Sequence, residues 1–223
     1  MCFRTLISVF CAVQSFVLET IAPKDPEIQK IENLGFEGFD EKALKSISMD
    51  VGKDTLCLYS YRDPLVKKAV LEVKSYGNKA IAAILGKAAH QALVDEISER
   101  ALLGRFDRPI LVPIPMTRKS MRARGWNQCM LVALALKEYD KADEFELMPE
   151  ALIKIRATED QVGKGRLERF RNLEKCFEAS LEVKNRNVIV LDDICTTGAT
   201  FKEAQRALKT AGARNILCIA LAH

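Results

Sequence analysis

One stretch near the carboxyl end of the sequence constrains the fold more than any other. Residues 188–191 form a continuous aliphatic run, typical of a strand that is buried on both faces of a parallel sheet. Asp192 and Asp193 follow it directly, and a loop rich in Thr and a helix over residues 201–210 come next. Open α/β sheets bind their ligands at the carboxyl ends of the strands. This order of strand, carboxylates, loop and helix therefore predicts a ligand site.

The residue types in this stretch suit a ribose phosphate. Adjacent carboxylates can accept hydrogen bonds from vicinal ribose hydroxyls or reach the water shell of Mg²⁺. The loop offers hydroxyl donors, and the first N–H groups of the following helix, which Gly212 should end, would face an anion. An ordinary strand-to-helix connection is the alternative, but two adjacent Asp side chains repel each other unless a cation or a polyol uses them. The loop residues are Thr196, Thr197, Gly198, Ala199 and Thr200.

The stretch resembles the phosphoribosyl-diphosphate (PRPP) signature of type I phosphoribosyltransferases. That resemblance assigns Asp192 and Asp193 to the ribose 2′- and 3′-hydroxyls, and the loop from Thr196 to Thr200 to the 5′-phosphate. It implies an α/β protein with the type I phosphoribosyltransferase fold, a parallel sheet flanked by helices.

The rest of the chain agrees with one α/β domain. Its 223 residues allow a single sizeable domain with a small appendage, which we place at residues 1–54, with the phosphoribosyltransferase-like domain at residues 55–223. We expect strands over residues 55–61, 108–115, 148–155 and 216–221 and helices from Asp63-Pro64, over 81–98 and over 129–137. Within the appendage we expect an irregular connector over 22–54, with one short helix near 41–47.

Net charge and the amino-terminal segment bear on possible nucleic-acid partners and on a possible membrane span. The 34 Lys and Arg against 30 Asp and Glu give a net charge of +4, which neither requires nor excludes nucleic acid. The apolar amino-terminal segment is short and is interrupted by Gln14 and Ser15, so we expect a docked amphipathic helix and no membrane span.

Cysteine usage favours a reduced, cytoplasmic protein without zinc. The seven cysteines are odd in number and scattered, and no Cys-x-x-Cys pair occurs. His90 and His223 lie far in sequence from any cysteine cluster, so a structural zinc site is not expected.

A basic cluster follows the predicted strand 108–115. It consists of Arg118, Lys119, Arg122 and Arg124, and no Asp or Glu lies between residues 108 and 137. Arg binds phosphate oxygens bidentately, so the cluster suits the diphosphate of PRPP, although a solvated loop is the alternative. We expect Trp126 to pack and Asn127 or Gln128 to cap the next helix.

A second basic segment, residues 156–172, has the composition of a mobile lid. Its two glycines could act as hinges, and Lys164, Arg166 and Arg169 could close over the diphosphate and exclude water. A flexible, solvated connector is the alternative.

Together these segments resemble the ComF family, phosphoribosyltransferase-like bacterial proteins associated with DNA uptake in natural competence. The match covers about residues 55–222 in the same order and spacing. It is carried by Val112-Pro-Ile-Pro, Arg122-Ala-Arg-Gly-Trp-Asn-Gln, Arg169-Phe-Arg-Asn and the Asp-Asp-Ile-Cys-Thr-Thr-Gly-Ala-Thr loop. Many ComF proteins begin with a four-cysteine zinc module, but Cys2 and Cys11 do not form that motif here.

Two roles remain open at this stage. As an enzyme, the protein would bind PRPP with Mg²⁺ and transfer phosphoribosyl to an unidentified nucleophile, with Asp192, Asp193 and Arg122 as the catalytic residues. As a binding protein, it would sense a ribose phosphate and contact single-stranded DNA or a DNA-uptake helicase. Salvage of 6-oxopurines is disfavoured, because the family members that use them carry a third Asp where this chain has Thr196, and a hydroxyl is a weak base.

Overall fold

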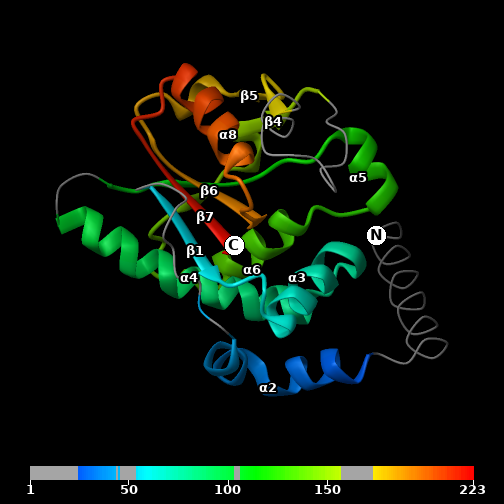
Figure 1. Cartoon of the computed structure of the whole chain (residues 1–223). Helices are drawn as coiled ribbons and strands as arrows, with labels where there is room; N and C mark the ends of the chain where they lie inside the picture. Colours follow the sequence, from blue (N-terminus) through cyan, green and yellow to red (C-terminus); the bar gives the residue numbers. More distant parts are fainter. Residues whose placement is uncertain (1–24, 44, 46–53, 103–105, 157–172) are drawn as a thin grey trace, which may run out of the picture.

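The fold is a parallel sheet with helices on both faces. The computed structural model describes residues 25–43, 45, 54–102, 106–156 and 173–223, and Figure 1 shows their arrangement. Strands β1 (Thr55–Tyr59), β2 (Ile110–Pro113), β3 (Glu146–Leu147), β6 (Asn187–Ile194) and β7 (Asn215–Ala222) form a five-stranded sheet in the order β1-β7-β6-β2-β3. Every pair in it is parallel, so the predicted α/β class is confirmed.

Two hydrophobic cores lie on opposite faces of this sheet. Side chains of β6 alternate, with Ile189 and Leu191 in one core and Val188 and Val190 in the other, and all four are 0% exposed. The first core is covered by α2 (Pro26–Lys42), α3 (Pro64–Tyr76), α4 (Lys79–Leu102) and α6 (Gln128–Tyr139). The second is covered by α8 (Ala199–Thr210) and the small antiparallel sheet of β4 (Leu152–Lys154) and β5 (Phe177–Ala179). Burial on both faces explains the unbroken aliphatic run in the sequence.

Local signals set the ends of the helices. Asp63 caps α3 by accepting a hydrogen bond from Leu65 N at 2.7 Å, and Pro64 occupies the first turn, as expected. At the other end of α3, Gly77 has a φ of 65° and meets the Trp126 ring, so a Cβ there would lie 3.0 Å from the indole. Trp126 also donates from Nε1 to Val73 O at 3.1 Å, which confirms its packing role.

The segment before β1 differs from expectation. In place of an irregular connector with a helix near residues 41–47, a 17-residue helix, α2, runs from Pro26 to Lys42, and Ala43 is already extended. Asp25 caps it, and Gly35, with a φ of 64°, kinks it. The kinked helix buries Ile28, Ile31 and Phe39 against the core, and this tertiary burial outweighs the Gly and Pro content that suggested a connector. Most of residues 44–53, like the expected amino-terminal helix, lies outside the described residues, and the boundary at residue 54 stays a prediction.

The predicted strand over residues 148–155 is also wrong in part. The chain forms β3 in the main sheet, then a 3₁₀ turn, η1 (Pro149–Ala151), and then β4 in the small sheet. Pro149 has no N–H to donate to a ladder, so the strand breaks there and the chain changes sheets. The small sheet's second strand, β5, and the 3₁₀ turn η2 (Leu181–Val183) carry no sequence signal that we identified.

No helix in the described part of the chain is long and apolar enough to cross a membrane.

Candidate functional site

The acidic pair lies at the carboxyl end of β6, in the centre of the sheet. This strand extends past the predicted aliphatic run and carries Asp192 and Asp193 within it, 7% and 9% exposed. The turn after β2 meets it there, because Ile114 N donates to Leu191 O at 2.8 Å. The carboxyl ends of β2 and β6 therefore lie side by side.

Asp192 is held on the inner side of the pair. Its Oδ1 accepts hydrogen bonds from Asp193 N at 2.9 Å and from the Cys129 thiol at 3.5 Å. Burial, together with the charge of Asp193, raises the pKa of Asp192 well above its ordinary value. Burial and the two carboxylates also raise the pKa of the Cys129 thiol, so the thiol stays protonated and acts as a donor.

Asp193 is oriented through both of its carboxylate oxygens. Ile194 N donates to Oδ1 at 2.9 Å, and Gln128 Nε2 donates to Oδ2 at 3.1 Å. Tyr61 lies within electrostatic reach, since burial and then the charge of Asp193 raise the pKa of its hydroxyl. Lys154 of β4 approaches from the small sheet: burial lowers its pKa, while the charges of Cys176 and Asp192 oppose that shift.

The loop after β6 forms a small pocket beside the acidic pair. The pocket is lined by Asp192 and by residues 194–201, which include all five predicted loop residues. Gly198 begins α8 with a φ of 71° and has no side chain to cap the helix, while Thr197 Oγ1 accepts from Ala199 N at 3.4 Å. At the far end, α8 stops at Thr210 and Gly212 has a φ of 92°, as the sequence predicted. A helix start, hydroxyls and a Gly turn are the features that suit the binding of an anion.

The basic cluster lies on a short helix, α5 (Arg118–Arg124), that follows the end of β2. Arg118, Lys119 and Arg122 are exposed, and among the described residues they make no hydrogen bond or ion pair. Arg124 is different, because its Nη1 donates to Gln128 Oε1 at 2.7 Å. The structure thus brings Arg124 to the acidic pair through Gln128 and leaves the other three basic side chains facing solvent. The proposed lid residues Lys164, Arg166 and Arg169 lie outside the described residues.

Of the two residues expected to cap α6, Asn127 does so, by accepting from Cys129 N at 2.9 Å. Other side chains at this site carry roles that the sequence did not predict. Gln128 bridges Arg124 and Asp193. Cys129, Tyr61 and Lys154 were not predicted either. The motif Arg-x-Arg-Gly-Trp-Asn-Gln contained the signal for Gln128, but the contact to Asp193 spans 65 positions of sequence.

One group of side chains in the described ranges has the spacing to hold a metal ion. Ligand atoms of Cys129, Asp192 and Asp193 all lie within 4.8 Å of one another. Carboxylate oxygens suit Mg²⁺, whereas a thiol suits softer metals, so only the two carboxylates fit the expected Mg²⁺. The described cysteines (Cys57, Cys129, Cys176, Cys195 and Cys218) are all buried and unpaired in disulfides.

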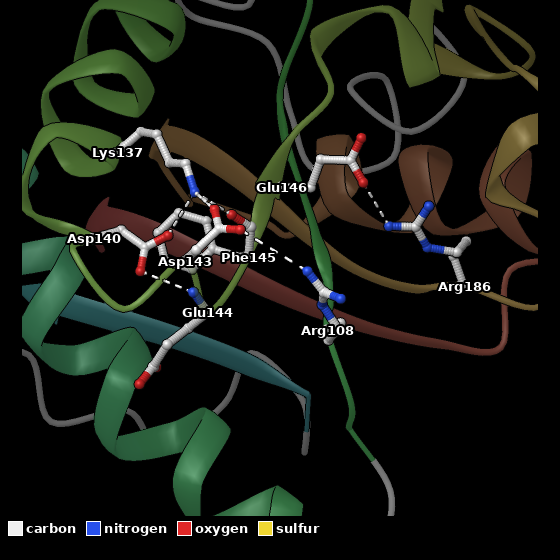
Figure 2. A network of polar contacts seen from close by, with 8 residues as sticks. All are labelled: Arg108, Lys137, Asp140, Asp143, Glu144, Phe145, Glu146 and Arg186. Carbon is white, nitrogen blue, oxygen red and sulfur yellow. Dashed lines mark hydrogen bonds and ion pairs between the residues drawn. The ribbon is translucent and has the colours of Figure 1, made fainter.

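A second polar cluster lies at the amino ends of the strands, at the opposite end of the sheet from the acidic pair (Figure 2). There Lys137 Nζ donates to Asp140 Oδ2 at 2.7 Å, to Asp143 Oδ1 at 2.6 Å and to Phe145 O at 2.6 Å. Asp140 Oδ1 in turn accepts from Glu144 N at 2.9 Å. These bonds fold the turn between α6 and β3, so we assign the cluster to structure.

Comparisons with known proteins agree with this placement. Residues 131–223 match the family described as "Phosphoribosyl transferase domain". Competence protein ComFC of Bacillus subtilis (strain 168) is 34% identical over 108 residues, which are 46% of this chain and 39% of ComFC. DNA utilization protein YhgH of Escherichia coli (strain K12) is 31% identical over 103 residues, 46% of this chain and 44% of YhgH. The matched regions span less than half the length of these curated relatives.

Among solved structures, a hypoxanthine phosphoribosyltransferase from Staphylococcus aureus is similar at 11% sequence identity. The similarity covers 62% of this chain and 61% of that one, with a TM-score of only 0.36. The family match is the more informative comparison, because residues 131–223 include β6, the loop, α8 and β7. The acidic pair and its loop therefore lie inside the matched region, whereas Tyr61, α5, Gln128 and Cys129 lie outside it.

Proposed function

Because this chain is a ComF-family protein with a type I phosphoribosyltransferase fold, we propose that it binds PRPP at the carboxyl end of β6. The observation that supports this most directly is the pocket that joins the buried acidic pair to the start of α8. The ribose hydroxyls would donate to Asp192 and Asp193, and the 5′-phosphate would accept from the loop hydroxyls and the first N–H groups of α8.

In this proposal, α5 binds the diphosphate. Arg118 and Arg122 are exposed and unpaired in the described part of the chain, so they can reach a ligand without breaking an existing ion pair. Mg²⁺, bound by PRPP and water, would supply further neutralisation of the diphosphate. If transfer occurs, the guanidinium groups would stabilise the departing diphosphate while a nucleophile attacks C1′. We expect no zinc requirement.

A second candidate function keeps the pocket but not the chemistry. The curated relatives are named for competence and DNA utilization, and α5 presents exposed basic side chains suited to nucleic-acid phosphates. The protein would then sense a ribose phosphate and act in DNA uptake by contacting single-stranded DNA or a helicase. The described residues show no clear element for recognising a nucleobase acceptor, which favours this alternative over a nucleobase enzyme.

The pocket is tested by removing the acidic pair. Calorimetry of Mg-PRPP binding should show that Asp193→Ala lowers affinity by about 1.5–3 kcal/mol, because bonds to a charged partner are lost. The double variant Asp192→Ala, Asp193→Ala should bind more weakly still. Unchanged affinity in the double variant would refute the proposed site.

The basic helix is tested by comparing two ligands. Arg122→Ala should weaken PRPP by roughly tenfold or more, from the loss of a charge-assisted bond, and barely affect ribose 5-phosphate, which has no diphosphate. Equal weakening of both ligands would exclude a diphosphate role. If neither changes and salt-sensitive binding of single-stranded DNA is lost instead, the binding-protein alternative holds. Diphosphate release with a panel of nucleobases and amines would then decide whether catalysis occurs.

A further inference from the structure

Arg124, Gln128 and Asp193 form a chain of hydrogen bonds that links α5 to the acidic pair. Arg124 Nη1 donates to Gln128 Oε1 at 2.7 Å, and Gln128 Nε2 donates to Asp193 Oδ2 at 3.1 Å. A guanidinium has no acceptor and an ionised carboxylate has no donor. Only one orientation of the Gln128 amide satisfies both neighbours, because rotation by 180° would oppose two donors at one end and two acceptors at the other.

The hydrogen-bond chain ends on Asp193, the carboxylate of the pair whose donors are less firmly fixed. Asp192 is held by Asp193 N and the Cys129 thiol, both within the buried floor of the site. Asp193 has one fixed donor, Ile194 N, on Oδ1, whereas its Oδ2 depends on Gln128. Without Gln128 this oxygen would lose its side-chain donor and could turn away from the ligand.

Burial and the charge of Asp193 disfavour the ionised form of Asp192. Asp192 lies next to Asp193 on β6, Cys129 approaches from α6 and Tyr61 from the segment after β1, and none of these brings a positive charge. Lys154 of β4 is within electrostatic reach of Asp192 but is itself desolvated. Among the described residues, the Arg124 guanidinium is the cation that hydrogen bonds link to Asp193, with Gln128 as the bridge between them.

We propose that Gln128, anchored by Arg124, is a positioning residue that orients Asp193 towards the ribose hydroxyls. The inference rests on the proposed binding of PRPP. It gives Arg124 a role on the ribose side of the site, in addition to any contact with the diphosphate. It also links the position of α5, which carries Arg118 and Arg122, to the orientation of the Asp193 carboxylate.

The test compares three substitutions. Gln128→Leu removes the donor, Gln128→Glu keeps an acceptor for Arg124 but places a carboxylate against Asp193, and Arg124→Met removes the anchor while leaving the amide. Gln91→Glu, exposed on α4, is the control for the change in net charge. Calorimetry measures the affinity for Mg-PRPP, for ribose 5-phosphate and for inorganic phosphate, and thermal melting verifies that each variant folds.

Each readout has a defined expectation. At pH 7, Gln128→Leu and Arg124→Met should weaken PRPP by about tenfold, and Gln128→Glu by more, with Gln91→Glu unchanged. Ribose 5-phosphate should weaken by a similar factor, because it carries the same 2′- and 3′-hydroxyls, whereas inorganic phosphate, which has none, should bind unchanged. Equal weakening of inorganic phosphate would mean that Gln128 serves only packing, and would overturn the proposal.

A measurement on the ligand-free protein separates this inference from the proposed function. In NMR spectra, the side-chain amide protons of Gln128 should exchange more slowly with solvent in wild type than in Arg124→Met, because Arg124 anchors the amide against Asp193. If wild-type protein fails to bind PRPP, the proposed function fails, and the exchange rates still decide whether Arg124 anchors Gln128. Identical exchange rates in wild type and Arg124→Met would overturn the inference even if PRPP binds.

Discussion

Asp192 makes the folded protein less stable at neutral pH than an uncharged residue would. Its side chain is buried beside a second carboxylate, and its pKa in the folded state is raised above its ordinary value. The sign follows from linkage: the folded state holds the proton more firmly than the unfolded state, so this stabilising contribution is complete at low pH and is lost as the pH rises through the raised pKa. A residue that was selected for stability alone would not be ionisable here, which fits a role in binding.

Asp192→Asn should therefore raise the melting temperature at pH 7, by roughly 2–4 °C, because Asn keeps Oδ1 as an acceptor for Cys129 and Asp193 N. The gain should shrink as the pH falls towards 4, where the wild-type carboxyl is protonated. Asp143→Asn is the matched control, since the Lys137 hydrogen bond lowers the pKa of that exposed carboxyl and its removal should not stabilise. A lower melting temperature for Asp192→Asn at pH 7 would contradict this account.

At the scale of elements, one amide joins the site's two main supports. Asn127 is buried, its Oδ1 accepts from Cys129 N at 2.9 Å, and its Nδ2 donates to Ile114 O at 2.9 Å. The first bond caps α6 and the second ties that cap to the end of β2. The start of α6, which carries Gln128 and Cys129, is thereby fixed against the strand edge where the acidic pair lies.

Asn127→Ala should lower the free energy of unfolding by about 2–3 kcal/mol, since it removes a cap and leaves a buried carbonyl without its donor. Chemical denaturation measures the change. Thr117→Ala is the comparison, because Thr117 caps only α5 and its Oγ1 accepts from Ser120 N on an exposed face. That variant should lose about 1 kcal/mol or less. Equal losses would mean that the bond to Ile114 contributes nothing.

Sequence reasoning worked where local pattern and tertiary burial agree. The strand before Asp192 was predictable because both faces of β6 are buried, and the α3 start because Asp63-Pro64 is a local signal. It failed for α2, whose helix depends on burying Ile28, Ile31 and Phe39. The bridge from Gln128 to Asp193 was not predictable either. The two residues are 65 positions apart in sequence, and only the folded sheet brings them together.

At the scale of the whole molecule, α4 and α6 pack tightly against each other over the first core. Gly86 of α4 makes this possible: a Cβ there would lie 2.8 Å from both Ala135 Cβ and Leu136 N. Neither partner is the end of a flexible side chain, so the two helices would have to separate.

Gly86→Ala should accordingly destabilise the fold by roughly 1–3 kcal/mol, although Gly→Ala inside a helix usually stabilises. Equilibrium unfolding in urea measures this, with Ser98→Ala on the exposed face of α4 as a control that should change little. Stabilisation by Gly86→Ala would show that the helices can adjust without loss.

The strand order has a consequence for folding during translation. β7 is the last strand in sequence, yet it lies between β1 and β6, and its end is fixed by bonds from Tyr61 N to His223 O at 2.9 Å and from His223 N to Tyr59 O at 3.0 Å. During synthesis at about 5–20 residues per second, β1 emerges from the ribosome long before its neighbour exists. Until β7 emerges, β1 cannot join the sheet and one edge of β6, with both carboxylates, stays open. The nascent chain therefore completes its ligand site only after nearly all of these residues have been translated, and until then two unpaired strand edges are available to chaperones.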